Sequence, residues 1–484
     1  MNRRAFLKSC SVAGGGILLS GLLGDYASAG SGQRPNVLWL VADDMCPDIG
    51  CYGNGLVHTP NLDRLAAEGT RFSRAFSTSP VCSASRSAFM TGMYQTTIGA
   101  HQHRPEQNKP LPGNVKVITD HFRAAGYFTA NAGKEDMNFY SKDAFDGRDW
   151  TEAKPSQPFF ARKNFGVTHR EFRRDPDHPI DADDVKLPPY YPDHPILRRD
   201  WANYLESIGN FDKQVGKQLD RLEEAGVLDN TIVFLFADQG RAHFRGKQWL
   251  YDGGIHIPLI VRWPGHIKAG AVVDDPVSAI DLAPTALSLI GEEVPEHIQG
   301  KVILGPDAET REYVFAARDR CDETFDRIRC VRSKRFKYIR NFLPHLPYTQ
   351  FNQYKYREYP AWTVMEVMYH EGKLNEAQSH FMGPIKPDEE LYDLAKDPHE
   401  VNNLAGKAEY KAVLEKMREA LNDWIKRTDD KGEDLEDRSK ALKWWSEKHG
   451  PKYKRVMRQR GLSPRVTPRE YLKYWEKRIL GSEK

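Results

Sequence analysis

The sequence predicts an α/β fold in which a doubly wound, mainly parallel sheet carries helices on both faces. Two continuous apolar runs of strand length, Asn36–Ala42 and Thr231–Ala237, are typical of parallel strands buried on both faces. Between them, helical patterns at 61–69, 117–126 and 204–226 alternate with shorter apolar segments. This alternation indicates strands joined by helices, a connection that makes successive strands run in the same direction.

The length of 484 residues indicates more than one domain, because a single hydrophobic core rarely serves so long a chain. We expect a large α/β domain over residues 33–320 and a smaller domain over 321–430. Alternating apolar and polar residues at 328–331 and 336–341 predict an antiparallel sheet in the smaller domain. Apolar residues recur at helical spacing from Tyr410 to Ile425 and predict a helix with one buried face.

The first 29 residues have the features of a secretory leader. A basic start with Arg3-Arg4 precedes an apolar run at 12–23 and small residues at 27–29 that suit cleavage. The paired arginines resemble the signal read by the twin-arginine export machinery. An N-terminal membrane anchor is the alternative, but the apolar run is shorter than a bilayer span requires. We therefore expect a bacterial protein that is periplasmic or secreted, with no stable membrane span in the mature chain.

The charge balance gives no reason to expect a nucleic-acid partner. The formal net charge is +3, and removal of the leader takes away three basic residues and one acidic residue, which leaves +1. Basic residues gather in the tail, residues 431–484, where sixteen Lys and Arg accompany eight Asp and Glu and six Trp and Tyr. Such a tail is either a binding site for an anionic polysaccharide or a solvated helical appendage packed by its aromatic residues. We favour the second interpretation.

Carboxylates follow both long strands at the point where each strand ends. Asp43-Asp44 comes after the first run and Asp238-Gln239 after the second. Because the carboxyl ends of parallel strands meet at one rim of a sheet, we expect these four side chains to lie together. Three carboxylates and an amide oxygen form a hard ligand set that suits calcium or magnesium rather than zinc. The alternative for each motif is structural, since Asp also caps turns and opens loops.

A cysteine stands at the predicted start of a helix, in the segment Cys82-Ser-Ala-Ser-Arg86. A thiol there meets unpaired backbone N–H groups and the positive end of the helix dipole, and Arg86 lies one turn along the same face. This arrangement suits an anion. The alternative is a buried, redox-inert cysteine before an ordinary helix, because five-residue patterns recur by chance.

The run from Cys82 to Thr91-Gly92 resembles the modification signature of the sulfatase family, Cys-x-(Pro/Ala/Ser)-x-Arg followed by Thr-Gly. The acid pair at 43–44, the phrase His-Thr-Pro-Asn-Leu-Asp-Arg-Leu-Ala at 58–66, and Asp-Gln-Gly at 238–240 with Gly-Lys at 246–247 occur in the family's order. The likeness covers roughly residues 35 to 405. It implies an alkaline phosphatase-like fold and a sulfuric ester hydrolase. It also implies that a maturation enzyme oxidises Cys82 to formylglycine, whose hydrate supplies the nucleophile.

The same resemblance implies one Ca²⁺ ion per chain. The ligands carried over from the family are Asp43, Asp44, Asp238, Gln239 and the modified Cys82. Gln239 departs from the usual Asn or His. It still offers an oxygen, but its longer side chain leaves the distance of this ligand open.

Sulfate cleavage requires positive groups around the non-bridging oxygens and an acid for the departing group. By resemblance, Lys134 and Lys247 face the sulfate, Arg86 neutralises charge beside residue 82, and His169 protonates the leaving group. An imidazole suits this last role because it titrates near neutrality. The alternatives are solvated surface lysines and a histidine that caps a loop.

The residues after Lys134 depart from the family pattern, in which a histidine follows. Glu135 and Asp136 stand there instead, and a carboxylate at this point would accept a proton during sulfate release or bind substrate. His101 and His103 form a cluster after the predicted helix, and they line the substrate pocket or lie on a solvated loop. We expect Asp136, His101 and His103 to be substrate-binding residues.

Segments at 187–193 and 340–342 resemble the sulfamidase and heparan-sulfatase branch of the family. That resemblance implies a sulfated, glycosaminoglycan-type saccharide as substrate and leaves open whether an O–S or an N–S bond is cut. One rival function is a phosphodiesterase or phosphonate monoester hydrolase of the same fold. Another is a catalytically decayed carbohydrate-binding protein, which Gln239 and the missing histidine suggest.

Overall fold

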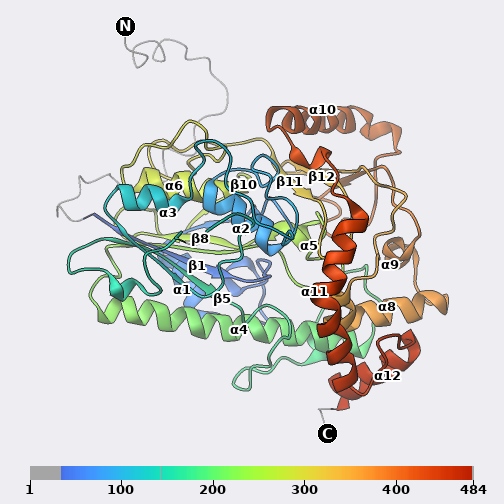
Figure 1. Ribbon diagram of the computed structural model, residues 1–484. Helices are drawn as coiled ribbons and strands as arrows, with labels where there is room; N and C mark the ends of the chain where they lie inside the picture. The colour runs from blue at the N-terminus through green and yellow to red at the C-terminus, as the bar shows by residue number, and fades with distance from the viewer. Residues whose placement is uncertain (1–33, 142, 482–484) are drawn as a thin grey trace.

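A seven-stranded sheet forms the centre of the protein (Figure 1). The computed structural model describes residues 34–141 and 143–481, so the predicted leader lies outside the described residues. The strand order is β4 (Phe128–Ala132), β5 (Phe159–Phe165), β1 (Asn36–Ala42), β6 (Thr231–Ala237), β8 (Leu259–Arg262), β2 (Thr70–Phe72) and β9 (Ala271–Val273). The first four strands are parallel, and β8 runs antiparallel to both of its neighbours. The sheet is therefore mainly parallel, as predicted.

The two apolar runs that predicted the fold lie side by side in this sheet. β1 pairs with β6 in register from Asn36 and Thr231 to Ala42 and Ala237, and every residue of both strands is buried. At the middle of β1, the fully buried Trp39 meets several phenylalanine rings edge-on, with centroids 5.1 to 6.2 Å away. The runs do not alternate with polar residues because both faces of the sheet are covered.

Helices cover both faces of the sheet (Figure 1). α2 (Cys82–Thr91), α3 (Ile118–Ala124) and α6 (Leu282–Leu289) lie on one face, and α1 (Pro60–Glu68) and α4 (Pro195–Glu224) lie on the other. α4 begins before the predicted residue 204, because His194 caps its first turn and Pro195 suits the first helical position. The doubly wound architecture is confirmed.

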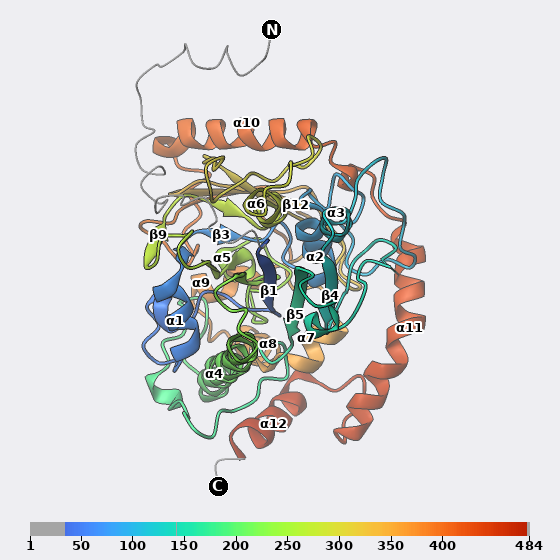
Figure 2. The same ribbon diagram turned by 90° about the vertical axis from the view of Figure 1, so that its left-hand side faces the viewer.

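A four-stranded antiparallel sheet forms the smaller unit (Figure 2). Its strands follow chain order as β11 (Val314–Arg318), β12 (Ile328–Arg332), β13 (Phe336–Asn341) and β14 (Glu389–Asp393). The helix α10 (Lys411–Arg427) covers this sheet with the apolar face that the sequence predicted. The sheet starts with β11, slightly before the expected boundary at 321. The short strands β10 (Val277–Ser278), β3 (Ala75–Phe76) and β7 (His256–Ile257) form a separate sheet.

The basic tail forms two helices, α11 (Arg438–Gln459) and α12 (Pro468–Ile479), that pack against the body of the protein (Figures 1 and 2). α11 contacts α7 (Gln353–Glu358), while α12 contacts α4 and α8 (Pro360–His370). Tyr471 and Trp475 of α12 are buried. The tail is therefore helical and packed by its aromatic residues, as in the favoured interpretation.

Shorter helices include α5 (Asp252–Ile255) and α9 (Glu376–Ser379). Within residues 34–141 and 143–481, no helix combines the length and apolar character needed to cross a membrane. The cysteines in this part of the chain, at positions 46, 51, 82, 321 and 330, are free thiols.

Candidate active site

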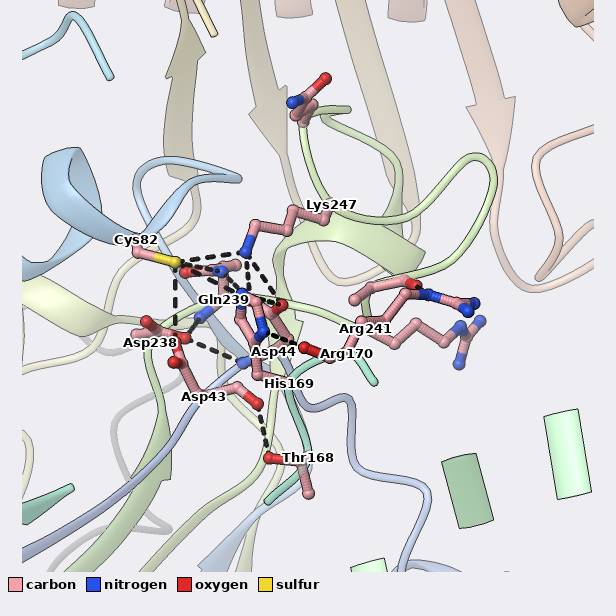
Figure 3. A network of polar contacts seen from close by, with 12 residues as sticks. Asp43, Asp44, Cys82, Thr168, His169, Arg170, Asp238, Gln239, Arg241 and Lys247 are labelled. Carbon is pink, nitrogen blue, oxygen red and sulfur yellow. Dashed lines mark hydrogen bonds and ion pairs between the residues drawn. The ribbon is translucent and has the colours of Figure 1, made fainter. Parts of the chain in front are cut away.

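Polar side chains gather at the carboxyl ends of the parallel strands (Figure 3). Asp43 and Asp44 follow β1, and Asp238 and Gln239 follow β6. Because β1 and β6 end in register, Asp238 Oδ1 accepts a hydrogen bond of 3.0 Å from the backbone N–H of Asp44. Lys134 reaches the same rim from its position two residues beyond β4. The strand ends therefore concentrate acidic and basic groups in one place.

Cys82 is the first residue of α2, and its thiol lies against the acidic strand ends (Figure 3). Its buried Sγ is 3.6 Å from Asp43 Oδ1 and 3.9 Å from Asp44 Oδ1. One turn along α2, the fully buried guanidinium of Arg86 donates from Nε to Asp238 Oδ2 at 2.9 Å. The helix therefore presents residue 82 and a compensating positive charge to the same rim.

Two lysines approach the acid pair from separate loops. Lys134 Nζ lies 3.0 Å from both carboxylate oxygens of Asp43. Lys247 Nζ lies 2.8 and 2.9 Å from those of Asp44, and 3.3 Å from Cys82 Sγ. Each carboxylate of the pair thus has its own ammonium group, and both ammonium groups flank residue 82.

The backbone around these side chains is constrained. A Cβ atom at Gly246 would stand 2.3 Å from the carbonyl oxygen of Arg241, so the turn that directs Lys247 requires glycine. Asp44, Asp136 and Gln248 have left-handed φ angles of 60°, 49° and 79°. Strained backbone conformations of this kind are found at functional sites, where the surrounding contacts hold them in place.

A divalent cation fits this cluster. Ligand atoms of Asp43, Asp44 and Cys82 lie within 4.8 Å of one another. Gln239 Oε1 is buried and, among the described residues, has no hydrogen-bond partner, while the Nε2 of the same amide is 3.2 Å from Cys82 Sγ. Carboxylate and amide oxygens are the ligands that hard cations prefer.

When all three carboxylates are ionised, the buried charges of the cluster balance. Three carboxylates and three cations make up the set, namely Asp43, Asp44 and Asp238 with Arg86, Lys134 and Lys247. Burial and the charge of Asp43 raise the pKa of Asp238 to about 7. Burial also raises the pKa of the Cys82 thiol to about 12. An unmodified thiol at this position is therefore protonated at neutral pH and is a poor nucleophile.

His169 lies on the loop after β5, beside Asp44 (Figure 3). Its Nε2 is 3.7 Å from Asp44 Oδ2 and 3.4 Å from the hydroxyl of Tyr354, and its Nδ1 is 2.7 Å from the carbonyl oxygen of Arg170. A carbonyl only accepts, so the contact assigns the proton of the neutral ring to Nδ1. The side chain is 28% exposed, which leaves Nε2 as the nitrogen that exchanges a proton with a ligand.

A cavity of about 470 Å³ opens over the cluster, a size typical of small-molecule sites. Five predicted residues line it, namely Asp43, His103, Lys134, His169 and Lys247. Sequence reasoning missed other lining residues, among them Arg104, Asp322, Glu323, Tyr354, Arg357, Trp445, His449 and Lys452. Arg104 comes from the loop after α2, and the others come from the loop after β11, from α7 and from α11. No local motif marks them. The mixture of basic and aromatic residues in the tail was the available signal.

Asp136 orients two of the cations. It accepts hydrogen bonds of 3.0 and 2.8 Å from Arg104 and lies 3.3 Å from Lys134 Nζ. Although burial opposes ionisation, Arg104 and Lys134 hold the pKa of the Asp136 carboxyl far below its usual range. The adjacent Glu135 is exposed, and its Oε2 is 3.4 Å from Ser141 Oγ.

The two predicted histidines lie in different places. His103 lines the cavity, and its Nδ1 is 2.8 Å from Asp322 Oδ1. His101 lines a neighbouring cavity beside residues 431–440. The structure therefore brings His103, but not His101, to the cluster around Cys82.

Comparison with known proteins identifies the family of this chain. The family described as Sulfatase matches residues 35–163 and 146–292, and the family described as N-sulphoglucosamine sulphohydrolase, C-terminal, matches 240–346. An ulvan-active sulfatase of Formosa agariphila is 35% identical over 447 residues, which cover 81% of this chain and 75% of that protein. The chain belongs to the sulfatase family. This sulfatase is an enzyme related to the sulfamidase branch, as the sequence predicted.

Another relative and two solved structures are also similar to this chain. The human N-sulphoglucosamine sulphohydrolase is 27% identical to this sulfatase over 468 residues, covering 82% of this chain and 91% of that protein. A protein solved with its substrate D-glucosamine-2-N,6-O-disulfate has a TM-score of 0.63 at 20% identity, over 82% of this chain and 99% of that one. The phosphonate monoester hydrolase of Agrobacterium radiobacter also has a TM-score of 0.63 at 20% identity, over 82% and 96%. These structures confirm the alkaline phosphatase-like fold.

Proposed function

We propose that this sulfatase hydrolyses sulfate esters or sulfamates of a glycosaminoglycan-type saccharide, with a formylglycine made from Cys82 as the nucleophile. The observation that carries the proposal is the position of Cys82. Its Sγ lies at the start of α2, within 4 Å of Asp43, Asp44 and Lys247. Hydroxyls of an aldehyde hydrate at this position would have carboxylates to accept their protons and cations to stabilise an attached sulfate. The human relative named for N-sulphoglucosamine supports the saccharide class.

In the transfer step, one hydroxyl of the hydrate at residue 82 would give its proton to a neighbouring carboxylate while its oxygen attacks the sulfur atom. The bond between sulfur and the leaving oxygen or nitrogen breaks, and the sulfate becomes attached to residue 82. Lys134 and Lys247 face the non-bridging oxygens, where negative charge gathers. The second hydroxyl then loses its proton, the carbon–oxygen bond to sulfate breaks, and the aldehyde reforms as sulfate leaves. Water restores the hydrate.

His169 supplies the proton that the leaving group requires. Its Nδ1 is held by the carbonyl of Arg170, so Nε2 is the atom directed to the reacting groups. A protonated imidazole donates from Nε2 to the departing alcohol oxygen or amine nitrogen. The neutral ring then recovers a proton from solvent through the exposed part of the cavity.

A Ca²⁺ ion would be held by Asp43, Asp44, Asp238, Gln239 and residue 82. When bound, it supplies positive charge that polarises the sulfate and lowers the pKa of the attacking hydroxyl. The protein's own buried charges balance in this cluster, so a divalent ion gives the site a net attraction for an anionic substrate.

Peptide mass spectrometry of the fragment that contains residue 82 tests this proposal directly. In protein produced together with a formylglycine-generating enzyme, we expect an aldehyde in place of the Cys82 thiol. A fully unmodified thiol in that protein would count decisively against formylglycine chemistry.

Rates on paired aryl esters separate the proposed function from its rivals. We expect hydrolysis of 4-nitrophenyl sulfate to exceed that of 4-nitrophenyl phosphate and of a phosphonate monoester. The reverse order would favour the phosphonate hydrolase function. A formylglycine-containing protein that releases no sulfate from any ester or glycan would instead be the decayed binding protein.

We also propose that the twin-arginine machinery exports this sulfatase to the periplasm or beyond. The paired arginines at positions 3 and 4 carry this proposal. Replacing both with lysine should retain the unprocessed protein in the cytoplasm, as cell fractionation would show. Unchanged export would contradict it.

A further inference from the structure

The helix α11 forms one wall of the catalytic cavity, although it belongs to the basic tail. Trp445, His449 and Lys452 line the cavity from positions four and three residues apart, a spacing that places them on one face of the helix. The family matches end at residues 292 and 346, well before this wall. The wall is thus a feature of this chain that the family match does not explain.

Contacts on both sides of α11 hold its cavity face in place. The rings of Trp445 and His449 stack with centroids 4.1 Å apart. Further along the helix, the buried Tyr453 donates to the carbonyl oxygen of Pro464 at 3.1 Å. Arg460 then donates to the carbonyl oxygen of Arg357 on α7 at 2.5 Å. A wall fixed in this way loses little conformational entropy when a ligand binds to it.

Among the residues that the structure describes, Lys452 is the lysine or arginine of the cavity that lacks an acidic partner. The other lysines and arginines that line it each have an acidic partner. Arg104 pairs with Asp136, Lys134 with Asp43, Lys247 with Asp44 and Arg357 with Glu358. Lys452 is exposed and, in the part of the chain that the structure describes, forms no ion pair. One turn away, His449 Nε2 is buried and lacks a hydrogen-bond partner among the same residues.

The carboxylates of Asp322 and Glu323, which also line the cavity, have other partners. Asp322 accepts from His103 and from the side chains of Gln248 and Asn352, at 2.8, 3.2 and 3.1 Å. Glu323 accepts a hydrogen bond of 2.6 Å from the backbone N–H of Gln353. Both carboxylates are therefore engaged by neighbours other than Lys452.

We propose that Lys452 and His449 form a subsite for a second anionic group of the saccharide, apart from the sulfate that is cut. The proposal rests on the proposed function, which gives the cavity a sulfated saccharide. A lysine ammonium is a mobile point charge and accepts either a second sulfate or a uronate carboxylate. The subsite would therefore favour saccharides with more than one charge over singly sulfated neutral sugars.

The test compares Lys452→Met with Lys454→Met. Lys454 is also exposed on α11, but it is two residues away on a different face and does not line the cavity. The probes are N-acetylglucosamine 6-O-sulfate, glucosamine 2-N,6-O-disulfate, and a monosulfated disaccharide that carries a uronate. The quantity measured is the KM of a doubly charged probe divided by the KM of the singly charged probe. We expect this ratio to rise about three- to tenfold in Lys452→Met and to stay unchanged in Lys454→Met.

The two doubly charged probes identify which anion the subsite binds. A rise with the disulfate assigns a sulfate subsite, and a rise with the uronate disaccharide assigns a carboxylate subsite. Ratios that stay the same in Lys452→Met, or that change equally in Lys454→Met, would overturn the proposal.

A binding measurement keeps the subsite testable if the proposed activity fails. Calorimetry with glucosamine 2-N,6-O-disulfate would compare Cys82→Ala with Cys82→Ala/Lys452→Met. We expect the double variant to bind more weakly, and equal affinities would refute the subsite. A protein that binds the probe through Lys452 but releases no sulfate would retain the subsite and lose the proposed reaction.

Discussion

At the scale of single residues, Cys82 is the position on which the proposed chemistry depends. We expect Cys82→Ala to lower kcat by about 10³-fold or more, because no other side chain replaces a lost nucleophile. The fold should persist, since alanine suits the first turn of α2. Steady-state kinetics and a thermal melt would measure both effects. The matched control is Cys51→Ala, which changes a half-buried cysteine outside the cavity. Retained activity in Cys82→Ala would exclude residue 82 as the nucleophile.

The role of His169 can be tested by comparing substrates with different leaving groups. A saccharide alcohol is a poor leaving group without a proton, so we expect His169→Ala to lower kcat/KM on a sugar sulfate by roughly 10²- to 10⁴-fold. The loss on 4-nitrophenyl sulfate should be much smaller, because nitrophenolate leaves without protonation. The two substrates serve as controls for each other. Equal losses on both would assign His169 to substrate binding rather than to proton transfer.

Glu323 gives the cavity a pH dependence of its own. Burial and the adjacent Asp322 raise the pKa of the Glu323 carboxyl to about 8. The carboxyl is therefore neutral at pH 7, and it adds a negative charge to the cavity as pH rises through about 8. We expect KM for an anionic substrate to increase above that pH, and Glu323→Gln to remove the increase. KM measured from about pH 6 to pH 9 checks this, and parallel profiles would assign the increase to another group.

At the scale of elements, the sequence was informative where a segment's environment is uniform. β1 and β6 were recognisable because both faces of each strand are buried, and their carboxyl ends had to share a rim once the strands were parallel. The sequence alone therefore predicts that Asp43, Asp44 and Asp238 lie together, and the structure confirms it. The amide of Gln239 illustrates its limit, because the strand end fixes the position of the residue but not which amide atom faces residue 82.

The residues that line the cavity walls could not be predicted from local sequence patterns. Asp322 and Glu323 follow β11, Tyr354 lies on α7, and Lys452 lies on α11, so each reaches the cavity through contacts far apart in the chain. The tail was expected to be helical and packed by its aromatic residues, but its composition gave no sign that α11 lines the cavity. His101 shares its local pattern with His103, yet the chain directs it to a neighbouring cavity.

The packing of α12 makes the tail's structural role measurable. Trp475 is 4% exposed and lies in the interface with α8. We expect Trp475→Ala to reduce the free energy of unfolding by about 3 to 5 kcal/mol, the usual cost of removing a large buried aromatic ring. Thermal melts and limited proteolysis near residue 460 would detect the loosened tail. The control is Trp444→Ala on α11, where the indole is only partly buried. A melt unchanged by Trp475→Ala would show that α12 contributes nothing to stability.

At the scale of the whole molecule, the site lies where three layers meet. The parallel sheet supplies the acidic rim, the small antiparallel unit supplies the loop after β11, and the tail supplies the α11 wall (Figures 1 and 2). A ligand that filled the cavity would contact all three. Binding at this junction should therefore stabilise the folded molecule as a unit, because a ligand that prefers the folded state shifts the unfolding equilibrium.

A bound divalent ion provides the clearest test of this coupling. We expect Ca²⁺ at about 100 times its dissociation constant to add about 2.7 kcal/mol to the free energy of unfolding. EDTA should reverse the resulting rise in Tm, and the measurement requires no substrate. Asp44→Asn should abolish the rise, because it removes a charged oxygen ligand from the cluster of Asp43, Asp44 and Cys82. The same change at the exposed Asp307, Asp307→Asn, should leave the rise intact. A Tm indifferent to Ca²⁺ in protein that carries the formylglycine would refute the calcium site.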